Sequence, residues 1–163
     1  MNILLMMLRS ARPSRTEDMK AIAKPRWIKQ GYEALTFFGT IITHTTQEAE
    51  MFNRRFDFLK NHEMIHLYQA RATHDSWTCF YLLYGWYWLC ASRYYRRLPN
   101  AGYLLNPFEL EAYGHMHDIH YLQRQQQAVE WKHYAQMSLA ERYTHYTKNM
   151  LQKQMSKNLV SSQ

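Results

Sequence analysis

From Thr40 to Tyr84 the chain contains neither glycine nor proline. These two residue types end helices and strands most readily, so long helices can form in this interval. The whole chain of 163 residues has only five glycines and four prolines, while 47% of its residues are hydrophobic. Such a composition argues against a disordered chain, a collagen or a many-stranded sandwich. It predicts one compact, mainly helical domain with a single core.

A small β element is expected before the helices. Residues 32–45 are rich in β-branched and aromatic side chains and predict a strand or a hairpin. Thr45 and Glu48 have the spacing of a capping box, so we expect a continuous helix from about Thr46 to residue 72. Residues 16–24 predict a short helix that ends before a proline. The predicted fold class is therefore mainly α with a small β element (α+β).

Residues 77–91 are apolar on nearly all sides, and three arginines follow, Arg93, Arg96 and Arg97. The segment is shorter than the roughly 20 residues that a straight helix needs to cross a bilayer. Its tryptophans and tyrosines, with the arginines after them, are typical of helices at a membrane surface. We favour a buried central helix, and leave open a helix on or partly within a membrane surface, or a true span.

Two further helices are expected downstream. Pro107 suits the first turn of a helix, which we expect to continue to about residue 131 with Gly114 as a weak point. Ser138 and Glu141 form a second capping box, which predicts a final helix. We divide the chain as follows: residues 1–26 form a peripheral N-terminal segment, residues 27–137 the main domain, and residues 138–163 a C-terminal helix with a frayed tail.

The ends and the cysteines of the chain bear on its location. The apolar run of residues 3–8 is shorter than the core of a secretory signal, and no basic segment precedes it. Cys79 and Cys90 belong to no CxxC pair and are predicted to be free buried thiols, as in a reducing compartment. We therefore expect a chain that is not secreted and that lies in the cytoplasm or at the inner face of a membrane.

The stretch of residues 61–70, NHEMIHLYQA, carries two histidines four positions apart. Positions i and i+4 lie on one face of a helix, so His62 and His66 can reach a single metal ion. Glu63 projects about 100° away around the axis, which suits a general base for a metal-bound water rather than a ligand. The HExxH pattern alone is only indicative, because an ordinary solvated helix face gives the same letters.

A catalytic zinc site needs a third protein ligand. Glu109 and Glu111 lie about 200° apart around a helix, so only one of them can easily face the site. We predict Glu109 as the ligand and keep Glu111 as the alternative. Gln69 is expected to support the site or to lie at the surface. The histidines at 115, 117 and 120 are interpreted as surface residues rather than as a second metal site.

The order of these motifs resembles known zinc proteins. Gluzincin peptidases carry HExxH on one helix and a ligand glutamate on a later helix, often four residues before an aspartate; Tyr113 stands there in this chain. The layout also resembles small uncharacterised bacterial HExxH proteins with the order NHExIHxxQ, an aromatic segment, FExEAY and W-x-x-Y. That resemblance covers roughly residues 32–135. It implies a minimal zincin-like helical core that binds Zn²⁺ through His62, His66 and Glu109, with Glu63 as the base.

The function implied by this resemblance is a zinc-dependent metallohydrolase, above all a peptidase acting on a peptide or protein substrate. Tyr113 departs from the gluzincin pattern, because a neutral phenol supports a ligand histidine less well than a carboxylate does. A catalytically silent zinc-binding or membrane-associated protein on the same scaffold is the alternative. In it, residues 77–97 would contact an anionic membrane surface, since the formal charge is +7. A nucleic-acid-binding module, using the basic aromatic residues 92–98, is the third hypothesis.

Overall fold

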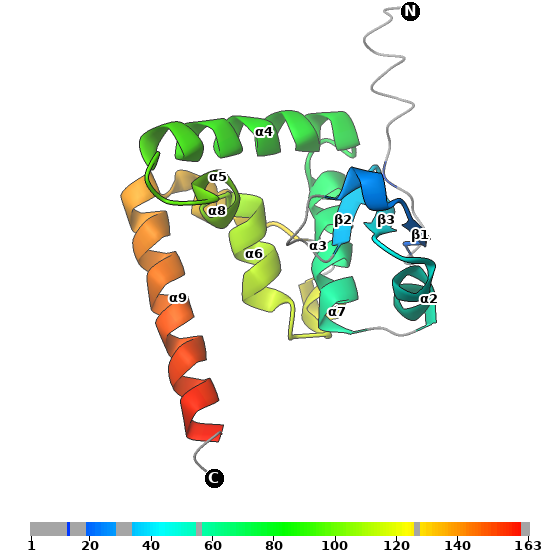
Figure 1. Cartoon of the computed structure of the whole chain (residues 1–163). Coiled ribbons are helices and arrows are strands. Elements are labelled where there is room, and N and C mark those ends of the chain that lie inside the picture. Colours follow the sequence, from blue (N-terminus) through cyan, green and yellow to red (C-terminus); the bar gives the residue numbers. More distant parts are fainter. Residues whose placement is uncertain (1–12, 14–18, 29–33, 55–56, 126–127, 161–163) are drawn as a thin grey trace, which may run out of the picture.

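The chain folds into many helices and one small sheet (Figure 1). The computed structural model describes residues 13, 19–28, 34–54, 57–125 and 128–160. Its elements are β1 (Ala21–Ala23), the 3-10 turn η1 (Pro25–Trp27), β2 (Ala34–Phe37), β3 (Thr40–Thr43), α2 (Thr46–Arg54), α3 (Phe58–Ala72), α4 (Trp77–Tyr94), α5 (Ala101–Leu104), α6 (Pro107–His115), α7 (Tyr121–Gln125), α8 (Trp131–Gln136) and α9 (Leu139–Val160). The predicted fold class, mainly α with a small β element, is confirmed.

The sheet has the strand order β1-β3-β2, in which β1 is parallel and β2 antiparallel to β3. The hairpin expected within residues 32–45 is therefore present, although residues 32 and 33 lie outside the described part. Its turn residues, Phe38 and Gly39, both have positive φ, at 47° and 81°. Glycine adopts this conformation readily but phenylalanine does not. The Phe38 ring is held by Tyr81, with the two ring centroids 5.1 Å apart.

The short helix predicted over residues 16–24 is wrong where it can be compared, because Ala21–Ala23 form β1. Residues 16–18 lie outside the described part of the chain. The Asn53 side chain from α2 explains the extended backbone. It accepts a hydrogen bond from the Ala21 N–H (2.8 Å) and donates one to the Ala21 carbonyl (3.1 Å). This long-range pair and the ladder to β3 outweigh the weak local helix propensity.

The continuous helix expected from Thr46 to residue 72 is also wrong, since the chain forms two helices, α2 and α3. The capping box at the start of α2 is present: Thr45 N–H donates to Glu48 Oε2 (2.9 Å), and Glu48 N–H donates to Thr45 Oγ1 (3.2 Å). The break follows from Asp57, whose backbone is extended and whose carboxylate accepts the N–H groups of residues 59 and 60. Asp57 thus caps the N-terminus of α3 and stops α2 from continuing into it.

Helix α4 lies along one side of the molecule (Figure 1) and packs on α3 and α5. Of its residues only Trp77, Phe80 and Ala91 are buried, whereas Leu82 and Trp86 are 70% and 60% exposed. The favoured prediction of a buried central helix is therefore wrong, because one face of α4 is exposed. Within the described residues, no helix combines the length and the apolarity needed to cross a bilayer. Cys79 and Cys90 are free, as predicted, but only half-buried.

Helix α6 begins as expected, with Asn106 as its cap and Pro107 in its first turn. It ends at His115 rather than continuing to residue 131. The buried Asn61 side chain of α3 explains the end, because its Nδ2 lies 3.0 to 3.1 Å from the carbonyl oxygens of residues 115, 116 and 118. The carbonyls of 115 and 118 also accept the N–H groups of Asp118 (2.9 Å) and Tyr121 (3.0 Å), which are turn bonds of three residues rather than the four-residue bonds of a continuing α-helix. The cap of α6 and this clamp by Asn61 fix α6 beside α3.

The C-terminal part closes the domain. Ser138 N–H donates to Glu141 Oε2 (2.7 Å) and Glu141 N–H donates to Ser138 Oγ (3.3 Å), so the predicted capping box opens α9. The segment between α4 and α6 contains the short α5, which lies so close to α4 that a Cβ built at Gly102 would stand 2.7 Å from the Trp88 carbonyl oxygen. The core forms around α3, between the sheet and α6, and includes Ile65 and Phe108.

Candidate metal centre

The site starts from the polar face of α3. Although α3 is rich in polar residues, it lies in the middle of the fold, and His62, Glu63 and His66 are each less than 10% exposed. The two histidines lie one turn apart, with their ring centroids 4.8 Å apart. Their Nε2 atoms are 3.2 Å from each other. Burial of three titratable side chains on one helix is unusual and calls for partners that compensate it.

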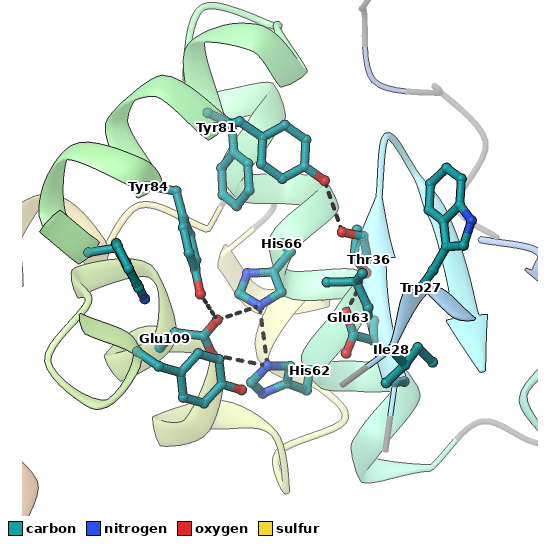
Figure 2. A pocket seen from close by; sticks show the side chains of 14 residues that line it. Trp27, Ile28, Thr36, His62, Glu63, His66, Tyr81, Tyr84 and Glu109 are labelled. Carbon is teal, nitrogen blue, oxygen red and sulfur yellow. Dashed lines mark hydrogen bonds and ion pairs between the residues drawn. The ribbon is translucent and has the colours of Figure 1, made fainter. Parts of the chain in front are cut away.

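Helix α6 brings Glu109 to this face (Figure 2). Glu109 Oε2 lies 3.4 Å from His62 Nε2, and Glu109 Oε1 lies 3.5 Å from His66 Nε2. The Glu109 carboxyl group is buried, and its position follows from the start of α6, where Pro107 and the cap at Asn106 fix the first turn. The structure thus brings together the three residues that were predicted as ligands, His62, His66 and Glu109.

The spacing of the three donor atoms tests whether a metal fits. Bonds of about 2.0–2.1 Å in tetrahedral geometry place donor atoms about 3.3 Å apart. The two histidine Nε2 atoms are 3.2 Å apart, and they lie 3.4 and 3.5 Å from the two different oxygens of the Glu109 carboxylate. With one ligand atom taken from each residue, all three atoms lie within 4.8 Å of one another, so they can surround one ion. Among the described residues, Glu109 Oε2 is buried and has no hydrogen-bond partner, which a cation would satisfy. The group can hold a metal ion, and no other such group of three occurs in the described part.

The charges at this site are coupled. Burial opposes ionisation of His62, but the adjacent Glu109 carboxylate outweighs this and raises the pKa of His62. Burial likewise opposes ionisation of Glu109, yet the adjacent His66 and His62 and the hydrogen bond from the Tyr84 hydroxyl lower the pKa of Glu109 below its usual value. A carboxylate that stays ionised while fully buried is ready to bind a cation.

Gln69 fixes the orientation of His66. The Gln69 Nε2 amide donates to the Phe108 carbonyl (2.9 Å) and to Glu111 Oε2 (2.8 Å), so Gln69 Oε1 must act as an acceptor. His66 Nδ1 lies 2.7 Å from this oxygen and therefore carries the proton. The lone pair of His66 Nε2 then faces the site, as metal binding requires. Gln69 supports the site, which was one of its two expected roles.

Glu111 is not the third ligand. It accepts hydrogen bonds from Gln69, from the Tyr121 hydroxyl (2.7 Å) and from the backbone N–H groups of Glu130 (3.0 Å) and Trp131 (3.2 Å). Burial raises the pKa of Glu111, although these donors oppose the rise. A carboxylate, an amide and an imidazole thus form a chain, Glu111–Gln69–His66, which sequence reasoning missed. No local signal could reveal it, because α8 must fold against α6 before Glu111 is surrounded by donors.

Tyrosines surround the Glu109 side of the site. The Tyr84 hydroxyl donates to Glu109 Oε1 (2.8 Å) and comes from α4 (Figure 2). Tyr113, which stands where gluzincins often have aspartate, packs its ring on His62 at a centroid distance of 4.5 Å. The hydroxyl groups of Tyr113 and Tyr103 lie 2.8 Å apart. The candidate ligand His66 is therefore oriented by Gln69 on the same helix, and not by a carboxylate at position 113.

Glu63 lines the same cavity as the three candidate ligands, with a volume of about 320 Å³. Its carboxylate accepts a hydrogen bond from the Thr36 hydroxyl of β2, so strand and helix hold it together (Figure 2). The cavity walls are mostly aromatic. Besides Thr36, Glu63 and the ligand group, the lining residues are Trp27, Ile28, Ala34, Leu35, Phe80, Tyr81, Tyr84, Trp88 and Tyr103. A polar group of four side chains therefore lies at one wall of an apolar cavity, as is typical of a binding site.

The other histidine cluster does not converge. His115 Nε2 lies 2.8 Å from Glu130 Oε2, and its ring stacks on Tyr121. The His117 ring packs against Phe58, and His120 Nδ1 lies 3.0 Å from the Gln123 side-chain oxygen. Each histidine has a different partner, and the three do not form a group of converging donor atoms among the described residues.

Comparison with known proteins adds no relative. No protein-family model, no curated protein and no solved structure matches the chain. The resemblance to zincin-like peptidases and to small HExxH proteins therefore stays a prediction, and the functional argument rests on the geometry of the site.

Proposed function

We propose that the chain is a zinc-dependent hydrolase of amide or peptide bonds. One observation carries the proposal: His62, His66 and Glu109 each offer a buried ligand atom within 4.8 Å of the other two, and the carboxylate of Glu63, which is outside this group, lines the same cavity. Three protein ligands leave a fourth position open, as catalytic zinc sites do and closed structural sites do not. The donor set of two imidazoles and one carboxylate favours zinc over magnesium or calcium, which prefer oxygen ligands.

The bound ion would polarise the substrate carbonyl and make water acidic enough to lose a proton near neutral pH. Glu63 is the group that receives this proton, because it lines the cavity without belonging to the ligand group. Thr36 holds one oxygen of the Glu63 carboxylate. Glu63 then returns the proton to the leaving amine. Gln69 keeps the His66 proton on Nδ1, and Tyr84 keeps Glu109 in place.

The cavity supports an extended peptide as the substrate. Among the described strands β2 lies at the edge of the sheet, and its residues Ala34, Leu35 and Thr36 line the cavity beside Glu63. An extended peptide can add to such an edge as a further strand. The Thr36 carbonyl already accepts a hydrogen bond from the Tyr81 hydroxyl (2.9 Å), so a peptide would pair with the remaining backbone groups of β2 or displace this contact. The aromatic walls, from Trp27 across to Trp88, favour a peptide with a large apolar side chain near the cleaved bond.

The test uses the full chain loaded with zinc and a library of peptides. We expect stoichiometric zinc in the wild type and in Glu63→Gln, with hydrolysis falling at least 100-fold in Glu63→Gln because the base is lost. Glu50→Gln, on the exposed surface of α2, is the matched control and should keep both properties. Hydrolysis that is equal in the wild type and in Glu63→Gln would refute the proposal.

A catalytically silent zinc-binding protein is the second candidate. The hydrogen bond from Thr36 favours it, since a carboxylate held by a strand can also serve only to join β2 to α3. Under this alternative Glu63→Gln lowers stability and leaves no hydrolytic activity to lose. Zinc bound in a one-to-one ratio without peptide cleavage by the wild type would select it.

A further inference from the structure

A row of large apolar side chains runs along the outer face of α4. Leu82, Trp86 and Leu89 are 70%, 60% and 45% exposed, and we call them the α4 stripe. Their spacing of four and three residues places them on one face of the helix. Single exposed apolar residues are common in proteins, but a row of three on one helix face marks an interaction surface.

The C-terminal end of α4 is basic. Arg93 follows Leu89 by four residues, on the same face as the α4 stripe, and Arg96 and Arg97 come just after the helix. All three are exposed, and none forms an ion pair with any residue in the described part of the chain. Helix α4 itself contains no aspartate or glutamate. Its outer face thus combines apolar side chains with cations that lack a counter-charge.

We propose that this face docks on the surface of a bilayer that contains anionic phospholipids. A helix that exposes Trp and Leu side chains on one face, with arginines beside them, can lie in the plane of the bilayer interface. Lipid phosphates supply the negative charge that the three arginines lack. A second copy of the chain pairing through α4 would supply none there, because α4 has no acidic residue.

The helix lies on the bilayer rather than across it. No described helix is able to span a membrane, and the inner face of α4 is occupied by contacts with the fold, through Phe80 and Ala91. Tyr94, 68% exposed at the end of α4, suits the headgroup level. Trp88 of the same helix lines the cavity, so docking brings the cavity close to the bilayer. The docking itself does not depend on the proposed hydrolase activity.

Flotation of the full chain with vesicles tests the proposal. We expect binding to vesicles of phosphatidylcholine with 30% phosphatidylglycerol, weak binding to pure phosphatidylcholine, and loss of most binding in 0.5 M NaCl. The triple variant Leu82→Ser/Trp86→Ser/Leu89→Ser should bind at least about tenfold more weakly, because it loses the apolar contact. The double variant Arg96→Gln/Arg97→Gln should lose about fivefold in affinity per charge.

Two control variants match these changes. Met51→Ser removes an exposed apolar side chain of α2, and Lys132→Gln/Lys148→Gln removes two exposed positive charges elsewhere. Both should bind vesicles like the wild type, and all variants should keep the wild-type circular dichroism and zinc content. The proposal is overturned by absence of flotation, by equal binding to neutral and anionic vesicles, or by a triple variant that binds normally. A dimer in lipid-free solution that the triple variant dissociates would also overturn it, in favour of a second copy.

Discussion

Helices α3 and α4 follow one another in the chain, and each inverts the usual relation between polarity and burial. Helix α3 contains Asn61, His62, Glu63, His66 and Gln69, and all five are buried. Helix α4 is the more apolar of the two, yet one face of it is exposed along its length. Buried polar groups and exposed apolar rows are the informative exceptions in a fold. Here one marks the candidate metal centre and the other the proposed docking face.

The difference shows that a side chain of these two helices is buried where a neighbouring element offers it a partner, whatever its own hydropathy. The five buried polar side chains named above contact α6, the turn after it, or β2, for example Glu109 for the two histidines and Thr36 for Glu63. The outer face of α4 meets no other described element. If this comparison is correct, substitutions on α3 should have large effects and those on the outer face of α4 almost none.

The largest effect is expected on α3, from Asn61→Ala. Its buried side chain donates to the carbonyl oxygens of residues 115, 116 and 118, and the variant would remove this clamp, although the carbonyls of 115 and 118 would keep a backbone donor. We expect a loss of about 2–4 kcal/mol in unfolding free energy, or roughly 5–15 °C in melting temperature. Thermal unfolding of the zinc-free chain measures it, with Asn149→Ala on α9 as control. A change below 1 kcal/mol would show that α6 does not depend on this clamp.

The next effect tests how α3 orients its histidine. Gln69→Ala removes the acceptor of the His66 Nδ1 proton and the link to Glu111. Zinc affinity should fall by about 10- to 100-fold, as for other groups that hold a ligand histidine. Competition with a chromophoric chelator gives the dissociation constant. Gln136→Ala at the end of α8 should leave the dissociation constant unchanged. Equal zinc affinity in the two variants would show that the chain Glu111–Gln69–His66 does not support metal binding.

A smaller effect is expected where α4 touches the site. Tyr84→Phe removes only the hydroxyl that donates to Glu109 Oε1. A hydrogen bond to a charged group contributes about 1.5–3 kcal/mol, part of which the bound zinc would replace. We therefore expect zinc to bind up to about tenfold more weakly, measured in the same chelator assay. Tyr94→Phe at the exposed end of α4 is the matched control, and a loss shared by both would point to a general effect on α4.

The smallest effect is expected on the outer face of α4. Trp86→Ser removes the largest side chain of the α4 stripe, which is 60% exposed. In lipid-free solution it should change the unfolding free energy by less than about 0.5 kcal/mol. Urea titration measures it. A loss above 2 kcal/mol would mean that Trp86 packs in the core, and the contrast between the two helices would then disappear.

The sequence was sufficient for what depends on local spacing. The capping boxes at Thr45 and Ser138, the hairpin, and the start of α6 at Pro107 were all predictable, since each signal lies within a few residues. The convergence of His62, His66 and Glu109 was predictable in part, because the i, i+4 spacing of the histidines leaves only a third candidate ligand to be found. Glu109 was chosen as that third ligand because the order of motifs resembles that of known zinc proteins, and not because any distance could be calculated.

What the sequence could not predict depends on contacts between distant segments. The end of α6 is set by Asn61 from another helix, and β1 is extended because Asn53 and β3 hold it. The exposure of α4 was unpredictable for a different reason. A helix that is apolar on all sides has no periodicity from which to infer its buried face. The break at Asp57, in contrast, was predictable from the sequence. An aspartate before an apolar run is a common helix N-cap, and the prediction of one continuous helix did not take it into account.

The close approach of α5 to α4 has a consequence for recognising relatives of this chain. At Gly102 no side chain fits, since even a methyl group would meet the Trp88 carbonyl oxygen and the Ser92 hydroxyl. A distant sequence that shares HExxH but carries a bulky residue at the equivalent of Gly102 would need a different packing of α5 on α4. Tyr103, the next residue, which lines the cavity, would then be placed differently. This one position can therefore separate true structural kin from chance matches to a five-letter motif.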